Sequence, residues 1–261
     1  MNLSDLLRKN DIDPQHVLVL RHRPPEPKLN EVFRSWASEK PEVFNAYQQT
    51  QGAKVERAMQ GAKYVASFIG HEAGKALFVG LYSVGDSKPL TVEEYWRVPA
   101  YIEMRAFGTK GFTGDDGRKS ILWFDLALTD FCSSWKGKLI VKWPPQDRAW
   151  WRWADRNEFR ILAILEDSAL DAVMPRWDEM ALTWEQLKFL PTRWKASLSA
   201  WRGIYYIFDA SCGRAYVGSA YGADNLLGRW LNYAATGHGG NKLLRGRDPQ
   251  HFRFSLLQLV A

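Results

Sequence analysis

Hydrophobic positions in the first two thirds of the chain mostly follow the two-residue period of β-strands. Short runs of this kind lie at residues 17–20, 63–70, 75–84, 121–126 and 138–143. Turn-forming Gly, Pro and Asp residues separate several of them, and helical spacing is found at residues 2–12 and 29–48. The pattern predicts an α+β protein whose first domain, residues 1–167, is strand-rich and barrel-like.

Between residues 168 and 200 the spacing becomes helical. Thr183 and Gln186 have the three-residue separation of an N-terminal capping box, and Pro191 ends the helix that follows. A further helix is predicted over residues 193–201. We therefore expect residues 168–200 to form a helical connector.

Residues 201–261 begin with the pattern of a β-hairpin. Alternating β-branched and aromatic residues occupy 203–208 and 214–218, with turn-forming residues between them. Leu226, Trp230 and Tyr233 then recur at helical spacing. The pattern predicts a strand, a turn, a second strand and a helix.

Two tripeptides in this region resemble the motifs that name the GIY-YIG nucleases. They are Gly-Ile-Tyr at 203–205 and Tyr-Val-Gly at 216–218, and their tyrosines are eleven positions apart. Arg229 matches the family's helix arginine, and residues 236–242 resemble the continuation in a subgroup of bacterial members. The resemblance implies a GIY-YIG α/β nuclease domain over residues 201–261, in a DNA endonuclease that hydrolyses phosphodiester bonds.

Phosphodiester hydrolysis requires an activated water and positive charge on the developing phosphorane. The resemblance assigns these roles to Tyr205, Tyr216, Arg229 and His238. Tyr205 would orient or deprotonate the water, which requires nearby cations to lower its pKa from about 10. Arg229 would hold the scissile phosphate through its planar guanidinium group, and His238 would be an auxiliary base or phosphate contact.

Members of this family also hold a divalent metal ion with a glutamate on a later helix. No glutamate follows Glu185, so the resemblance places that residue beyond Ala261. We expect the intact enzyme to use Mg²⁺ or another divalent ion, with no metal ligand in residues 1–261. Residues 1–261 alone are expected to bind DNA and to cleave it little or not at all.

The charge of the chain suits a polyanionic partner. The formal net charge is +6, and seven basic residues against three acidic ones follow Trp201. We expect Arg214, Lys242, Arg245 and Arg247 to contact double-stranded DNA, although a solvated basic surface is the alternative interpretation. RNA stays open as a target, because no residue pattern here separates it from DNA. A symmetric cut of both strands would favour a homodimer.

Thirteen tryptophans are many for a chain of 261 residues. In general pattern the first domain resembles the PUA-like superfamily of small barrels, which read modified or flipped bases in an aromatic pocket. This resemblance implies a modification-dependent restriction nuclease acting in phage defence. The simpler interpretation is that the tryptophans fill a core. The candidate pocket residues are Trp96, Trp123, Trp143, Trp151 and Trp153.

Two other function classes stay open: a DNA-binding reader with a degenerate nuclease scaffold, and a repair or recombination nuclease for branched DNA. Cys132 and Cys212 belong to no Cys/His cluster, so no structural zinc site is expected. The N-terminus does not read as a secretory signal, and no apolar run approaches the roughly 20 residues of a membrane span. We therefore expect a cytoplasmic protein.

Overall fold

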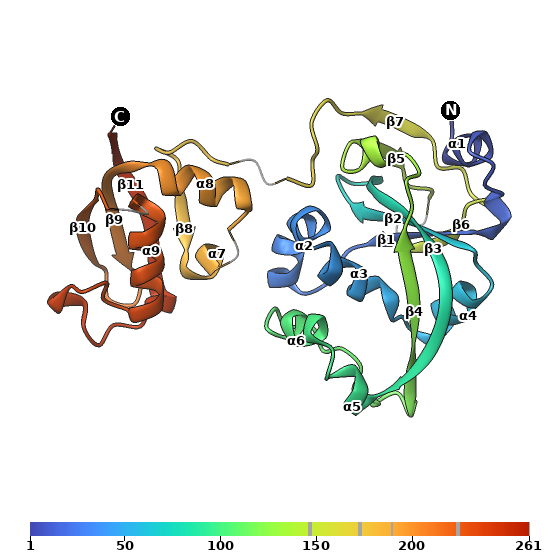
Figure 1. Ribbon diagram of the computed structural model, residues 1–261, viewed down its shortest axis with the longest axis horizontal. Helices are drawn as coiled ribbons and strands as arrows, with labels where there is room; N and C mark the ends of the chain where they lie inside the picture. Colours follow the sequence, from blue (N-terminus) through green and yellow to red (C-terminus); the bar gives the residue numbers. More distant parts are fainter. Residues whose placement is uncertain (146–147, 172–173, 189, 223–224, 261) are drawn as a thin grey trace. The chain divides into compact units, whose positions relative to one another are not determined.

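The computed structural model describes residues 1–145, 148–171, 174–188, 190–222 and 225–260. The chain divides into two compact units, Met1–Asp171 and Ala172–Ala261 (Figure 1). Each unit has its own sheet, helices and core, and the protein is mixed α+β, as the sequence predicts.

The first unit is built on a curled, half-barrel sheet whose described strands run in the order β6-β1-β2-β3-β5-β7. The strand β4 also pairs with β3. The pair β1 and β2 is parallel, and the other pairs are antiparallel. The strands are β1 (Val17–His22), β2 (Tyr64–Gly70), β3 (Lys75–Thr91), β4 (Ser120–Leu128), β5 (Leu139–Lys142), β6 (Trp151–Trp153) and β7 (Ile161–Ile164).

Proline marks the start of several helices in this unit. Pro27, Pro41 and Pro99 each occupy the first helical turn, where a missing N–H costs no hydrogen bond. The sequence pattern predicts helical structure over residues 29–48 that Pro41 interrupts. In the structure Pro41 is the first residue of a second helix. The helices are α1 (Leu3–Lys9), η1 (Pro14–His16), α2 (Pro27–Glu39), α3 (Pro41–Gln49), α4 (Ala53–Gln60), α5 (Val92–Tyr95), α6 (Pro99–Arg105) and η2 (Ser133–Trp135).

Both faces of β1 are buried along its whole length. Val17 and Val19 belong to a core cluster that includes α1, whereas Leu18 and Leu20 pack with Met59 of α4. A strand covered on both faces needs a continuous apolar run, which explains the sequence Val-Leu-Val-Leu.

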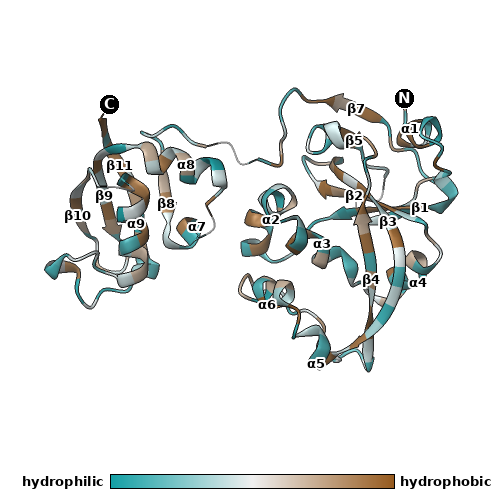
Figure 2. Cartoon of the chain, viewed as in Figure 1, coloured by the Kyte–Doolittle hydropathy of each residue, from teal (hydrophilic) through white to brown (hydrophobic). Residues whose placement is uncertain are grey.

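The second unit contains a four-stranded antiparallel sheet in the order β10-β9-β11-β8. The predicted hairpin is confirmed as β9 and β10, and the predicted helix as α9. Figure 2 shows that β9 and β11 carry mainly hydrophobic residues. The elements are β8 (Ala181–Thr183), α7 (Trp184–Lys188), α8 (Thr192–Ala200), β9 (Arg202–Asp209), β10 (Arg214–Ala220), α9 (Asn225–Thr236), η3 (Lys242–Leu244), η4 (Pro249–His251) and β11 (Phe252–Val260).

The segment 168–200, for which a connector is expected, contributes β8, α7 and α8 to the second unit. Strand β8 pairs with β11, and Leu198 of α8 lies in one core cluster with Trp230 of α9. The capping box is confirmed, because the Gln186 N–H donates to Thr183 Oγ1 at 3.1 Å and the Thr183 N–H donates to Gln186 Oε1 at 2.8 Å. Nowhere in the described ranges does a helix have the length and apolar character to cross a membrane.

Candidate active site

A cavity of about 690 Å³ lies in the second unit, where β9, β10, α9 and the loop after α9 meet. Three of the four predicted catalytic residues line it together. The lining residues are Tyr205, Tyr216, Ser219, Arg229, Tyr233, Gly239, Gly240, Asn241 and Lys242.

The pairing register of the hairpin explains why two of the tyrosines meet. Gly218 lies opposite Tyr205, and Tyr216 lies opposite Ile207, so the two tyrosines are diagonal neighbours on one face of the sheet. Their ring centroids are 6.3 Å apart. Tyr233 reaches the same place from α9, with its ring 6.0 Å from that of Tyr205 and 5.9 Å from that of Tyr216. The three phenols therefore form one cluster.

Two glycines make room for this cluster. A Cβ at Gly218 would lie 2.5 Å from the Tyr205 hydroxyl oxygen and 2.8 Å from the Tyr216 ring. A Cβ at Gly239, whose φ is +53°, would lie 2.7 Å from the Tyr233 ring. The last residue of the second motif is therefore glycine because the phenol of the first motif lies across it.

The hydroxyl groups of Tyr205 and Tyr233 have a raised pKa and are therefore protonated at neutral pH. Tyr205 is 1% exposed, and burial raises its pKa despite the opposing effect of the Arg229 guanidinium. Burial, followed by hydrogen bonds to Tyr205 and Tyr216, also raises the pKa of Tyr233. The expectation that cations lower the pKa of Tyr205 is therefore wrong for this state of the chain, because desolvation of the phenolate is the larger effect.

The polar lining of the cavity suits an anion. Arg229 and Lys242 are exposed and bring two positive charges, and Asn241 and the hydroxyl groups add neutral hydrogen-bond donors. Among the described lining residues none is a carboxylate, and no group of three potential metal ligands occurs in the described part of the chain. The residues present therefore do not fit a Mg²⁺ site, which would need oxygen ligands with negative charge.

His238, the fourth predicted catalytic residue, is not among the described lining residues. Its Nδ1 accepts a hydrogen bond from the Gly240 N–H at 3.0 Å, within the loop that follows α9. His238 therefore helps to shape this loop. The fourth side chain of the cavity that carries a reactive group beside Tyr205, Tyr216 and Arg229 is Tyr233, which was not predicted. The sequence contained a signal for Tyr233, since it lies four residues beyond Arg229 and so on the same side of α9.

The four predicted DNA-binding residues have different surroundings. Lys242 lines the cavity, whereas Arg214 and Arg245 are exposed outside its lining. Arg247 Nη1 lies 3.4 Å from Asp209 Oδ2 and donates to Cys212 Sγ at 2.8 Å. Arg247 therefore holds the turn of the β9–β10 hairpin.

None of the five predicted tryptophans is among the described residues that line the cavity of the second unit. Trp143 is buried and donates to the Ala149 carbonyl at 2.9 Å, and Trp151 and Trp153 pack against the core around β1. The indole N–H of Trp96 donates to the Phe112 carbonyl, and the indole N–H of Trp123 donates to Gln49 Oε1. Their packing agrees with the simpler interpretation, that these side chains fill and cover a core.

A separate cavity of about 770 Å³ lies in the first unit. Its aromatic lining residues are Tyr47, Tyr95, Tyr101, Phe112 and Trp150, and none of the five candidate tryptophans is among them. The sequence does contain one signal for this cavity, a glycine at every third position of the segment 108–117. The four glycines, all with positive φ, are Gly108, Gly111, Gly114 and Gly117. Such a repeat indicates an irregular segment that lies close to its neighbours.

The chain was compared with known proteins at three levels. No family model, no curated protein and no solved structure matches it. The functional assignment therefore rests on the residues and geometry of the two cavities.

Proposed function

We propose that the second unit is the catalytic part of a DNA endonuclease that hydrolyses phosphodiester bonds. The observation that carries the proposal is the convergence of three phenols and one guanidinium group on one cavity. They belong to Tyr205, Tyr216, Tyr233 and Arg229. A cavity with positive charge and neutral hydroxyl groups supplies two of the features that phosphate-ester hydrolysis requires, stabilisation of the developing negative charge and hydrogen bonds to an attacking water.

In the proposed reaction, Arg229 donates two parallel N–H groups to the non-bridging oxygens of the scissile phosphate. Lys242 supplies a second positive charge at the same cavity. A water oxygen attacks phosphorus while the bond to the leaving oxygen breaks, and the two cations stabilise the charge that develops. The Tyr205 hydroxyl borders the cavity and orients this water, and it accepts the water's proton when it is ionised.

The raised pKa of Tyr205 predicts how nicking depends on pH. The pKa lies above the ordinary value of about 10, so the phenolate fraction rises with pH throughout the neutral range. We expect the logarithm of the nicking rate to rise with a slope of about one between pH 7 and 9, without a plateau. Tyr205→Phe should lower the rate and abolish this slope, as measured on supercoiled plasmid.

Tyr206→Phe is the matched control, because Tyr206 is the next residue on β9 and stacks on Phe208, away from the phenol cluster. This control should keep both the rate and the slope. A wild-type rate that levels off below pH 8, or an unchanged slope in Tyr205→Phe, would show that Tyr205 is not the base.

We also propose that the reaction requires Mg²⁺ or another divalent ion, as the family resemblance implies. Nicking is therefore measured with and without Mg²⁺. We propose double-stranded DNA as the substrate, with Lys242, Arg214 and Arg245 contacting its backbone.

The first unit is proposed to select the DNA, so that the whole protein acts as a modification-dependent restriction nuclease in phage defence. One observation favours a second candidate, a DNA-binding reader that does not cleave: no carboxylate is among the described residues that line the cavity. A protein that binds duplex DNA, but does not nick modified or unmodified phage DNA in Mg²⁺, would favour the reader.

A further inference from the structure

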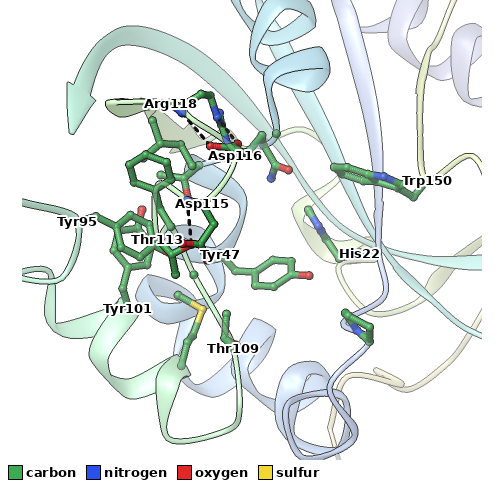
Figure 3. Close-up of a pocket in the computed structure, with 18 of the residues that line it drawn as sticks. His22, Tyr47, Tyr95, Tyr101, Thr109, Thr113, Asp115, Asp116, Arg118 and Trp150 are labelled. Carbon is green, nitrogen blue, oxygen red and sulfur yellow. Dashed lines mark hydrogen bonds and ion pairs between the residues drawn. The ribbon is translucent and has the colours of Figure 1, made fainter. Parts of the chain in front are cut away.

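The cavity of the first unit lies between the end of β1, helices α3 and α6, and the segment 108–117. In Figure 3, Tyr47 lies in the middle of the cavity lining, with Tyr95 and Tyr101 on one side of it and His22 and Trp150 on the other. The Tyr95 and Tyr101 rings are stacked, with centroids 3.9 Å apart and planes within 3°. The cavity is therefore walled by aromatic rings from several elements.

Two buried hydroxyl groups in this cavity form no well-aligned hydrogen bond with any described residue. Tyr101 is 1% exposed, and its hydroxyl interacts with Thr50 but forms no well-aligned hydrogen bond within the described chain. The same holds for the buried hydroxyl oxygen of Thr109. Buried polar groups are almost always paired, because an unpaired one loses its hydration without compensation. Two such groups in one cavity point to a ligand that supplies their partners.

His22 adds a neutral polar group to the same wall. Burial lowers its pKa to about 4, so the ring is uncharged at physiological pH. Its Nε2 lies 3.2 Å from Gln48 Oε1, and the Gln48 amide donates to Asn45 Oδ1. Gln48 Oε1 is therefore the acceptor and His22 Nε2 the donor, which leaves His22 Nδ1 as an acceptor. Neutral donors and acceptors among aromatic rings suit a planar heterocycle.

The charged residues of the lining favour an anionic group. Arg118 is paired, with Nε 2.6 Å from Asp116 Oδ2 and Nη1 3.0 Å from Glu56 Oε1. Arg23 and Arg148 also line the cavity and are exposed. Four arginines and two aspartates are present in the lining, so its charge is positive while His22 is neutral: Arg21, Arg23, Arg118 and Arg148 against Asp115 and Asp116.

The glycine-rich segment brings its backbone against the aromatic rings. A Cβ at Gly111, whose φ is +62°, would lie 2.7 Å from the Trp96 ring and 2.9 Å from the Tyr95 ring. Residues 111–116 therefore form a wall of the cavity largely through their backbone and short side chains. Such a wall offers peptide groups for hydrogen bonds to a ligand.

We propose that this cavity binds a nucleotide, with the base among the aromatic rings and the phosphate at the exposed arginines. Aromatic side chains stack on any base, and the hydroxyls of Tyr101 and Thr109 bond to its edge. The nucleotide has two potential sources: a residue flipped out of a DNA strand, or a free nucleotide. Only the DNA source rests on the proposed function, because this cavity shares no lining residue with the cavity around Tyr205.

The test is calorimetric titration of residues 1–261 with the four 2′-deoxynucleoside 5′-monophosphates and with short DNA. The DNA is single-stranded or a duplex with one mismatch, whose bases flip readily. These titrations use the Arg229→Ala chain, so that binding by the second unit is reduced and a failure of either proposal can be distinguished. We expect at least one of these ligands to bind with a dissociation constant below about 1 mM.

Tyr101→Phe and Thr109→Val should each weaken this binding about tenfold, the effect of one lost hydrogen bond to the ligand. Their melting temperatures should stay the same or rise, because each change removes a buried hydroxyl that forms no well-aligned hydrogen bond in the free chain. Tyr64→Phe is the control, since Tyr64 packs in the core outside the cavity and should leave affinity unchanged.

If Tyr101→Phe weakens binding of the monophosphates, the source is a free nucleotide. If Tyr101→Phe weakens only the binding of DNA, the source is a base flipped out of the strand. Absence of binding to every probe would overturn the proposal. Binding that both cavity variants leave intact would also overturn it, as would a lowered melting temperature in Tyr101→Phe with unchanged affinity.

Discussion

Replacing Arg229 by alanine is expected to lower the rate of DNA nicking about a hundredfold to a thousandfold. Arg229 is exposed on α9 and lines the same cavity as the three phenols. Its guanidinium group would contact the phosphate most strongly when negative charge develops in the transition state. Because the side chain is exposed, the free energy of unfolding should change by no more than about 0.5 kcal/mol.

Plasmid nicking and thermal unfolding, measured on the same preparations, check this result. Arg229→Lys should recover little activity, since an ammonium group cannot replace two parallel N–H donors. Arg193→Ala on α8 is the control for loss of an exposed arginine in the same unit, and it should nick at the wild-type rate. Retention of wild-type nicking by Arg229→Ala would remove this residue from the site.

Gly218→Ala is expected to have the second largest effect, a loss of nicking of about a hundredfold or more. The new methyl group would lie 2.5 Å from the Tyr205 hydroxyl oxygen and 2.8 Å from the Tyr216 ring, so both phenols must move. Tyr205 is buried and belongs to the core of the second unit, so a shift of its ring disturbs the residues packed against it. We therefore also expect the second unit to lose about 1–3 kcal/mol of stability, the usual cost of overpacking.

Gly222→Ala provides the control, because a Cβ at Gly222 would meet no atom within 4 Å. Nicking and the unfolding midpoint are compared for the two glycine variants. If Gly218→Ala nicked DNA as fast as Gly222→Ala, the arrangement of the phenols would not matter to the reaction.

The local elements of the second unit could be predicted from sequence. The β9–β10 hairpin and α9 follow from alternating and helical spacing over short stretches, and the capping box of Thr183 and Gln186 depends on residues three apart. The strand β11 was not predicted, although it lies between β9 and β8. Its partners are far away in sequence, and no local pattern specifies which strand it will join.

The motif glycines show what a tripeptide does not reveal by itself. A Cβ at Gly203 would lie 2.1 Å from the backbone oxygen of Gln258, where the pairing of β9 with β11 has a bulge. This close approach of two backbones depends on a strand about fifty residues later in the chain. The sequence therefore locates the glycine, and only the fold supplies its reason.

The candidate sites divide in a similar way. Tyr205, Tyr216 and Arg229 were selected from their motif, whereas Tyr233 was not, although its spacing from Arg229 on one helix is visible in the sequence. The pKa of Tyr205 was expected to fall because the cations were visible in the sequence and the burial was not. In the first unit, attention to tryptophan missed a cavity walled largely by tyrosines, because total aromatic content does not indicate which rings face an open space.

The claim that Tyr205 and Arg229 act on one phosphate group is tested most directly by a double-mutant cycle of nicking rates. The rates of wild-type protein, Tyr205→Phe, Arg229→Ala and the double variant are measured under identical conditions with Mg²⁺. Residues that act as a unit give non-additive losses, so the double variant should be about as slow as the slower single variant. Losses that multiply in the double variant would show that the two side chains act independently, and would contradict a shared site.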